Sequence, residues 1–195
     1  MSKKNENEEI KVILIGDSGV GKTNLINTSI GLEFSKTDSP TVSGSFVSKI
    51  YTINDKQYII NLWDTAGQEA YKGITQLFFR DSQIVILVYD ICSTTSFKSL
   101  DNWFELCEDT INNEHIYGFV GNKNDLYLNA EVTENEGKEY AKSKNSKFKL
   151  CSAKSDPQSF VDFVEELVIE YKQIKKINKS DMMAKKEDNN GCCGK

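Results

Sequence analysis

Eight consecutive residues near the start of the chain have the composition of a loop that binds phosphate groups. They run from Gly16 to Thr23 and read G-x-x-x-x-G-K-T, after the apolar run 12–15 and before a helical pattern that begins at Asn24. This order of strand, glycine-rich loop and helix lets backbone N–H groups converge on an anion at the positive end of a helix. We expect Lys22 to contact the outer phosphates of a nucleotide and the Thr23 hydroxyl to reach a magnesium ion.

The glycines of this loop allow a close backbone approach that a Cβ atom would block. The alternative interpretation is an ordinary glycine-rich turn between a strand and a helix. The residues that we expect to contact the nucleotide here are Ser18, Gly19, Val20, Gly21, Lys22, Thr23 and Asn24.

A second set of suitable residues follows the strand-like run that ends at Trp63. Asp64 can hold magnesium, usually through water, and the Gly67 amide can meet a terminal phosphate. Gln68 is uncharged and suited to orienting an attacking water molecule. Thr41 lies in a loop before the second strand-like run and offers another hydroxyl to magnesium. The alternative is a common strand exit with a solvated acid.

Two motifs at later strand ends contain the groups that a guanine base requires. Asn122, Lys123 and Asp125 follow one strand-like run. The carboxylate of Asp125 can accept from N1–H and from the exocyclic amine of guanine, a donor pair that adenine lacks. The last strand-like run is followed by a tripeptide whose backbone can donate to guanine O6, namely Ser152, Ala153 and Lys154.

The strand-like runs that must position these residues span 10–15, 45–53, 57–63, 84–90, 116–121 and 148–151. Helical patterns separate most of them, including an apolar stripe over 97–111, a capping box that starts at Thr133 and a closing helix that begins near Pro157. Strands that alternate with helices predict an α/β fold with a mostly parallel, six-stranded sheet flanked by helices on both faces. We expect the ligand loops at the carboxyl ends of the strands.

The composition narrows the class of protein further. The chain has 195 residues, enough for one domain, and its net charge of -5 argues against non-specific nucleic-acid binding. Its longest apolar runs have the length of strands, so we expect no segment that spans a bilayer. Five cysteines without a secretory signal indicate a reducing compartment.

The pattern divides the chain into three segments. We expect residues 1–8 to be a flexible N-terminus and residues 9–175 to form the folded domain. Residues 176–195 are polar and without periodicity, so we expect them to be disordered. Cys192 and Cys193 lie in this tail, where packing cannot explain them.

These motifs together resemble those of small GTPases of the Ras superfamily, and the chain is most similar to the Rab branch. The resemblance covers about residues 9–175 and the final cysteines, and the spacing of Thr23, Thr41, Asp64 and Asn122 is typical of Rab proteins. It implies a P-loop NTPase-type small G domain that binds GTP or GDP. It also implies that Thr23, Thr41 and Asp64 hold Mg²⁺.

The resemblance assigns roles to several aromatic residues. Phe34 falls where the family stacks an aromatic edge on guanine, and a simple loop anchor is the alternative. Phe46, Trp63 and Phe78 match the aromatic residues that Rab proteins present to effectors, and partly buried hairpin packing is the alternative.

Other positions depart from the family pattern. The usual Thr-Ile-Gly segment is replaced by Thr41-Val42-Ser43, and Asp38 stands where an aromatic residue is usual. The expected nucleotide contacts are therefore kept, while the surface that partners read has changed. This combination indicates an atypical Rab protein with a divergent switch I region.

The resemblance implies a molecular switch that hydrolyses GTP slowly and acts in vesicle trafficking at the cytosolic face of an intracellular membrane. Lys22 and Gln68 are the catalytic residues that it implies. No arginine stands near the loop before Thr41, so the resemblance implies that a GTPase-activating protein supplies the fast rate. The other implied partners are effectors, an exchange factor, a prenylation escort and a chaperone of the GDI type, with no nucleic acid among them.

The adjacent Cys192 and Cys193 resemble the double geranylgeranylation site of Rab proteins. A C-a-a-X box that starts at Cys192 is a poor match, because Cys-Gly-Lys is not the expected aliphatic pattern. A pair of unmodified surface cysteines is the other alternative.

Two further functions remain open. A Ras-type signalling GTPase is favoured by Pro40-Thr41, whereas the spacing from Thr41 to Asp64 and the tail argue against it. A GTP-loaded scaffold with negligible hydrolysis would keep the same binding motifs and act as a binding module.

Overall fold

The computed structural model describes residues 8–36, 45–65 and 78–190, with side chains up to residue 178. One six-stranded sheet in the order β2-β3-β1-β4-β5-β6 lies at its centre. The strands are β1 (Glu8–Ile15), β2 (Ser45–Ile53), β3 (Lys56–Asp64), β4 (Ile84–Asp90), β5 (Ile116–Asn122) and β6 (Lys147–Leu150). β2 and β3 pair antiparallel, and every other pair of neighbours is parallel. The predicted mostly parallel sheet is confirmed.

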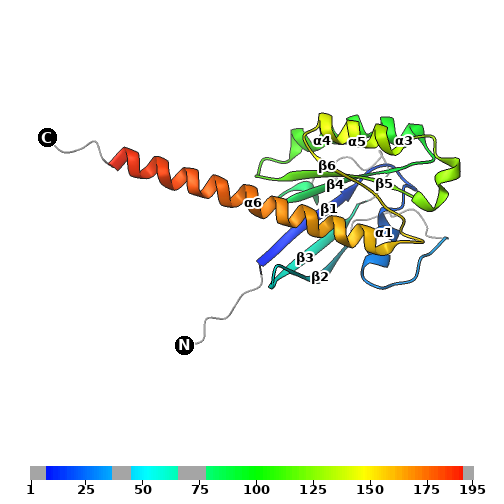
Figure 1. The fold of residues 1–195 in the computed structure, drawn as a ribbon, viewed down its shortest axis with the longest axis horizontal. Coiled ribbons are helices and arrows are strands. Elements are labelled where there is room, and N and C mark those ends of the chain that lie inside the picture. The colour runs from blue at the N-terminus through cyan, green and yellow to red at the C-terminus, as the bar shows by residue number, and fades with distance from the viewer. Residues whose placement is uncertain (1–7, 37–44, 66–77, 191–195) are drawn as a thin grey trace.

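Helices cover both faces of this sheet. They are α1 (Lys22–Ser29), α3 (Thr94–Lys98), α4 (Leu100–Thr110), α5 (Glu134–Ser143) and α6 (Pro157–Asn190), with a short 3-10 helix, η2 (Asn124–Asn129), after β5. α1 and α6 lie on one face, and α3, α4 and α5 lie on the other (Figure 1). The α/β architecture with helices on both faces agrees with the sequence prediction.

Alternate side chains of the central strand β1 enter two separate hydrophobic cores. Val12 and Leu14 belong to the core beneath α1 and α6, whereas Ile13 and Ile15 belong to the core beneath α3, α4 and α5. Successive side chains of a strand point to opposite faces. An unbroken run of apolar residues is therefore what a strand covered on both faces requires.

The parallel register brings the candidate functional residues to one edge of the sheet. Leu14 near the end of β1 lies beside Asp64 at the end of β3, and Asp90 at the end of β4 lies beside Asn122 at the end of β5. Three segments therefore leave the sheet at the same edge: the glycine-rich loop after β1, the segment that begins at Asp64, and the segment that begins at Asn122. This is the edge at which open parallel sheets bind ligands.

Two helices begin at the residues that the sequence predicts. The Thr133 hydroxyl accepts from the Glu136 N–H at 3.3 Å, and the Glu136 carboxylate accepts from the Thr133 N–H at 2.8 Å. These reciprocal bonds are the predicted capping box of α5. At the start of α6, Asp156 Oδ1 accepts from the Ser159 N–H at 3.2 Å, as an N-cap residue does.

Helix α6 differs from the sequence expectation at its far end. It continues to Asn190, past residue 176, where the polar composition predicts disorder. In Figure 1 this part of the helix extends beyond the sheet and the other helices. The sequence from 158 to 190 contains neither glycine nor proline, so nothing stops a helix that is already nucleated, and each added residue gains a hydrogen bond.

A search of the described helices for one with the length and the apolar composition of a membrane span finds none.

Candidate functional site

The glycine-rich loop after β1 approaches neighbouring strands so closely that two positions require glycine. Gly16 has a φ of 142°, and a Cβ atom there would lie 2.1 Å from the Val88 carbonyl oxygen in β4. Gly21 has a φ of 97°, and a Cβ atom there would lie 2.4 Å from Asn122 Nδ2 at the end of β5. The loop is therefore seated directly against the ends of these two strands.

The side chain of Lys22 is folded into this loop. It is buried, and its Nζ donates to the carbonyl oxygens of Gly16 at 2.8 Å and Asp17 at 2.9 Å. Burial lowers the pKa of Lys22 to about 8, while the carboxylates of Asp64 and Asp17 act in the opposite direction. A nearby anion would favour the charged form of this buried ammonium, so the position suits a phosphate group.

Two of the predicted metal ligands are in direct contact. The Thr23 hydroxyl at the start of α1 donates to Asp64 Oδ2 at 2.7 Å. The next residue of this strand exit, Thr65, donates to the Leu14 carbonyl oxygen at 2.7 Å and ties the exit to β1. A hydroxyl and a carboxylate are hard oxygen ligands of the kind that Mg²⁺ prefers, so the pair fits the ion. The third predicted ligand, Thr41, lies outside the described residues.

The other end of the site is organised by the Asn122 amide. Its Nδ2 donates to the Val20 carbonyl oxygen at 2.8 Å, and its Oδ1 accepts from the Ala153 N–H at 3.4 Å. Asn122 is 1% exposed, so water does not compete for these bonds. One buried side chain thus connects the glycine-rich loop to the loop that follows β6.

The Asp125 carboxylate is oriented by two neighbours from that same loop. The Ser152 hydroxyl donates to its Oδ1 at 2.6 Å, and Lys154 Nζ lies 3.7 Å from its Oδ2. The Ser152 oxygen also accepts from the Ser155 N–H at 3.1 Å, which fixes the direction of the hydroxyl. The carboxylate is therefore a fixed pair of acceptors rather than a freely rotating one.

Lys123 precedes this carboxylate in the chain and is also fixed. Its backbone has a φ of 68°, and its Nζ lies 2.6 Å from Asp90 Oδ2. The other oxygen of Asp90 accepts from the Cys92 N–H at 2.9 Å. The long methylene stem of Lys123 is thereby held beside the site.

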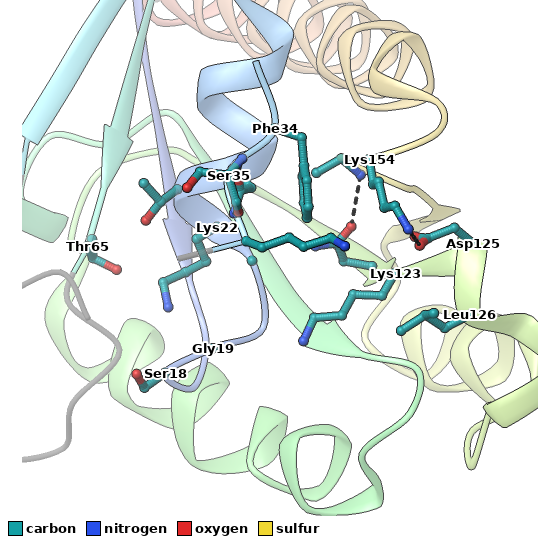
Figure 2. A pocket seen from close by; sticks show the side chains of 16 residues that line it. Ser18, Gly19, Lys22, Phe34, Ser35, Thr65, Lys123, Asp125, Leu126 and Lys154 are labelled. Carbon is teal, nitrogen blue, oxygen red and sulfur yellow. Dashed lines mark hydrogen bonds and ion pairs between the residues drawn. The ribbon is translucent and has the colours of Figure 1, made fainter. Parts of the chain in front are cut away.

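These groups line a cavity of about 560 Å³. In the view of Figure 2, Ser18, Lys22 and Thr65 lie toward one end, and Asp125 and Lys154 lie toward the other. All predicted nucleotide contacts among the described residues line this cavity except Val20 and Ser152. Those two stand behind it as hydrogen-bond partners of Asn122 and Asp125.

Four lining residues are absent from the sequence prediction, namely Ser35, Lys36, Thr65 and Leu126. Thr65 and Leu126 each follow a predicted site residue, so their place in the chain is a usable signal. Ser35 and Lys36 follow Phe34 in an irregular segment. Ser35 is held there by two hydrogen bonds to Asn24 of α1, a contact that no sequence motif indicates.

The three predicted aromatic residues form one cluster. The Phe46 and Trp63 rings are stacked with centroids 4.7 Å apart, and the Phe78 ring lies 5.6 Å from that of Trp63. Lys11 Nζ lies 4.6 Å from the Trp63 ring centroid. Phe46 is 55% exposed, so this cluster presents an aromatic surface to solvent.

Four further predicted residues lie outside the described part of the chain. They are Gly67, Gln68, Cys192 and Cys193, and Asp38 is outside it as well. Their roles stay predictions that rest on the sequence.

Comparison with known proteins identifies the class to which this fold and site belong. The model of the Ras family matches residues 11–173. The chain is 36% identical to Ras-related protein RabC from Dictyostelium discoideum over 95% of this chain and 99% of RabC. It is 37% identical to Ras-related protein Rab-2B from the same organism, over 74% of this chain and 72% of Rab-2B. It is 40% identical to Ras-related protein Rab-17 from Mus musculus, over 76% of this chain and 69% of Rab-17.

The chain therefore belongs to the Ras family of small GTPases. These relatives place it in the Rab branch, as the spacing of its motifs predicts. It is an enzyme that binds and hydrolyses GTP.

Proposed function

We propose that this GTPase is a Rab-type switch that hydrolyses GTP slowly on its own and acts in vesicle trafficking. The observation that carries the nucleotide assignment is the oriented Asp125 carboxylate at one end of the cavity. Guanine places two N–H donors side by side, at N1 and at the exocyclic amine, and a fixed carboxylate accepts from both. Adenine offers no such pair, so this residue would select the base.

The glycine-rich loop would bind the phosphates at the other end. Lys22 and the loop amides would neutralise charge on the outer phosphates. Thr23 and Asp64, with Thr41, would hold Mg²⁺, which supplies further neutralisation when it is bound. Gln68 would orient the attacking water.

The switch itself would depend on loops that sense the terminal phosphate. Thr41 and Gly67 would hold their loops only while that phosphate is present, so hydrolysis would release them. Effectors would then distinguish the two states through the surface that contains Phe46, Trp63 and Phe78.

Slow intrinsic hydrolysis is supported by the shortage of arginine. The one arginine of the chain is Arg80, whose side chain is 84% exposed and lies 3.6 Å from Asp81. An arginine that reaches the transferred phosphate accelerates hydrolysis by about 10³–10⁵-fold in enzymes of this kind. We propose that a GTPase-activating protein supplies it.

Membrane attachment would depend on Cys192 and Cys193. A single lipid chain gives marginal, reversible binding, whereas two chains give a stable anchor. Lipid on both cysteines would place the domain at the cytosolic face of an intracellular membrane, and an exchange factor, a prenylation escort and a GDI-type chaperone would complete the cycle.

Nucleotide binding to the purified chain tests the first part of the proposal. Fluorescent GTP and ATP analogues are titrated in the presence of Mg²⁺, and single-turnover hydrolysis of GTP is followed with and without a cell extract. We expect the GTP analogue to bind and the ATP analogue not to bind. Hydrolysis of GTP should be slow and should be accelerated by the extract. Equal binding of ATP would reject the base assignment, and negligible hydrolysis even with extract would favour the scaffold.

Cell fractionation tests the membrane role. The wild type should pellet with membranes, variants with either Cys192→Ser or Cys193→Ser should shift partly to the cytosol, and the double variant should be released. A double variant that stays on membranes would contradict the dual anchor.

A further inference from the structure

A pair of hydrogen bonds joins helix α1 to the segment that follows it. The Asn24 side chain accepts at Oδ1 from the Ser35 N–H and donates from Nδ2 to the Ser35 carbonyl oxygen, both at 3.0 Å. The side-chain amide thus pairs with both backbone groups of one residue, as a neighbouring strand would. Since Ser35 directly follows Phe34, these bonds fix the backbone beside that ring.

Hydrophobic packing does not hold this segment. Leu32 is 56% exposed and Phe34 is 37% exposed, and neither belongs to the two hydrophobic cores of the described residues. The beginning of the segment is tied to α1 by a bond from the Leu32 N–H to the Asn27 carbonyl oxygen at 3.0 Å. Hydrogen bonds from α1 therefore anchor it on both sides of Phe34.

The anchored ring lies at the cavity. Asn24, Phe34 and Ser35 all line it, and Figure 2 shows the Phe34 ring at its rim with Lys123 and Leu126 below it in that view. We infer that Asn24 is a positioning residue that keeps the Phe34 ring against the bound base and thereby slows release of the nucleotide. This inference rests on the proposed guanine-nucleotide site, and it assigns the effect to the Asn24 side chain rather than to its backbone in the phosphate loop.

The geometry also explains why an asparagine is suited to this position. It carries a donor and an acceptor on one short, planar group, and both are needed to meet the N–H and the C=O of Ser35. Alanine offers neither group. Aspartate keeps the acceptor but would place a second oxygen against the Ser35 carbonyl.

Release of a fluorescent GDP analogue from the full-length protein with Mg²⁺ tests this role. Asn24→Ala should release the nucleotide about tenfold faster, the size of effect expected when a pair of neutral hydrogen bonds is lost. Asn24→Asp should also be fast. Asn27→Ala makes the same change of side chain within the same helix and serves as the control at the wild-type rate. Alanine is a good helix former, so we expect α1 to be retained in both alanine variants.

A double-mutant cycle separates positioning from general loosening of the domain. In a Phe34→Ala background, Asn24→Ala should accelerate release by less than about twofold, because the ring that it positions is gone. The same tenfold acceleration in both backgrounds would overturn the positioning role. Hydrogen exchange of the Ser35 amide in the GDP-bound protein gives a second measurement, and it should be faster in Asn24→Ala than in the wild type.

Failure of this inference would differ from failure of the proposed function. If the nucleotide site is wrong, the wild type itself fails to retain GDP or binds ATP equally well. If only the role of Asn24 is wrong, the wild type retains GDP while Asn24→Ala releases it at the wild-type rate and shows unchanged exchange at Ser35.

Discussion

Hydrogen bonds hold both ends of the cavity, but the two ends offer different groups to a ligand. At the base end, Asn122 and Asp125 are held by hydrogen bonds to neighbouring loops, so their polar groups already have fixed directions. At the phosphate end, the central group is Lys22, a buried cation whose pKa is lowered by its burial. The base end therefore offers polar groups with fixed directions, and the phosphate end offers a buried positive charge.

This difference teaches where selectivity and affinity arise. Directed acceptors discriminate between ligands of similar size, because a mismatched donor leaves a buried polar group without a partner. A buried cation attracts any polyanion and discriminates poorly, although it binds strongly. We therefore expect substitutions at the base end to change which nucleotide binds, and substitutions at the phosphate end to change how strongly any nucleotide binds.

The largest expected effect is a change of base at Asp125. In Asp125→Asn the new amide can still meet the Ser152 hydroxyl, so the fold should be kept, but a donor now faces the donors of guanine. We expect GTP binding to weaken by about 3 kcal/mol, the cost of unmatched buried polar groups. Xanthosine triphosphate, which has a carbonyl in place of the amine, should bind better than to the wild type. Competition titrations measure both, and unchanged GTP affinity would break the proposed contrast between the two ends.

Gly21 lies where the two ends meet, so a substitution there should disturb both. Gly21→Ala places a Cβ atom 2.4 Å from Asn122 Nδ2 and forces a side chain onto a φ of 97°. Left-handed backbone alone costs a non-glycine residue about 1–3 kcal/mol, so we expect denaturant unfolding to report a loss of about 2 kcal/mol or more.

The matched control for this substitution is Gly19→Ala. Gly19 also has a positive φ, of 79°, but a Cβ atom there would have no neighbour within 4 Å among the described residues. The Gly19→Ala variant should therefore lose less stability than Gly21→Ala, and its Asn122 should be undisturbed. Equal losses of stability in the two variants would show that the contact with Asn122 does not matter.

A change of the water-orienting residue should separate catalysis from binding. Gln68→Leu keeps a similar volume but removes the amide, so GTP affinity should survive while single-turnover hydrolysis falls by tenfold or more, about 1.4 kcal/mol in the barrier. If Gln68→Leu and the wild type hydrolyse GTP at the same rate, another group must orient the water.

The fold and most of the site could be predicted because their signals are local. A strand covered on both faces needs consecutive apolar residues, and a loop that approaches a strand as closely as Gly16 does needs glycine. The six strands are predicted with small errors at their ends, such as β1, which begins at Glu8 rather than at residue 10. A motif at the carboxyl end of such a strand is placed as soon as the order of elements is known.

Contacts between residues of different motifs or elements could not be predicted in this way. The Asn24 amide and the Ser35 backbone meet because of how the chain turns after α1, and composition does not encode that turn. The extended end of α6 is a different case, since its polar residues carry no apolar period although they tolerate a helix well. An apolar period in the sequence indicates a helix that packs against a core, but it does not indicate a helix that continues beyond the core.

The smallest expected effect concerns another distant contact, between α4 and the phosphate end. Trp103 is buried, and its Nε1 donates to Asp17 Oδ1 at 2.7 Å, while the Asp17 carbonyl oxygen accepts from Lys22. Trp103→Phe keeps an aromatic ring in the core and removes this bond. Asp17 is partly exposed, so water can replace part of what is lost, and we expect nucleotide affinity to weaken by about 1 kcal/mol.

This loss should be the same for GTP and for xanthosine triphosphate, because the contact orients the loop and not the base. Asp17→Asn keeps an oxygen acceptor for Trp103 and removes the charge, so it separates the hydrogen bond from the electrostatic influence of Asp17 on Lys22. If the bond matters, Asp17→Asn should bind more tightly than Trp103→Phe does in the same titration. A shift in the ratio of the two affinities in Trp103→Phe would instead mean that α4 also shapes the base end, and the two ends would then not be separable.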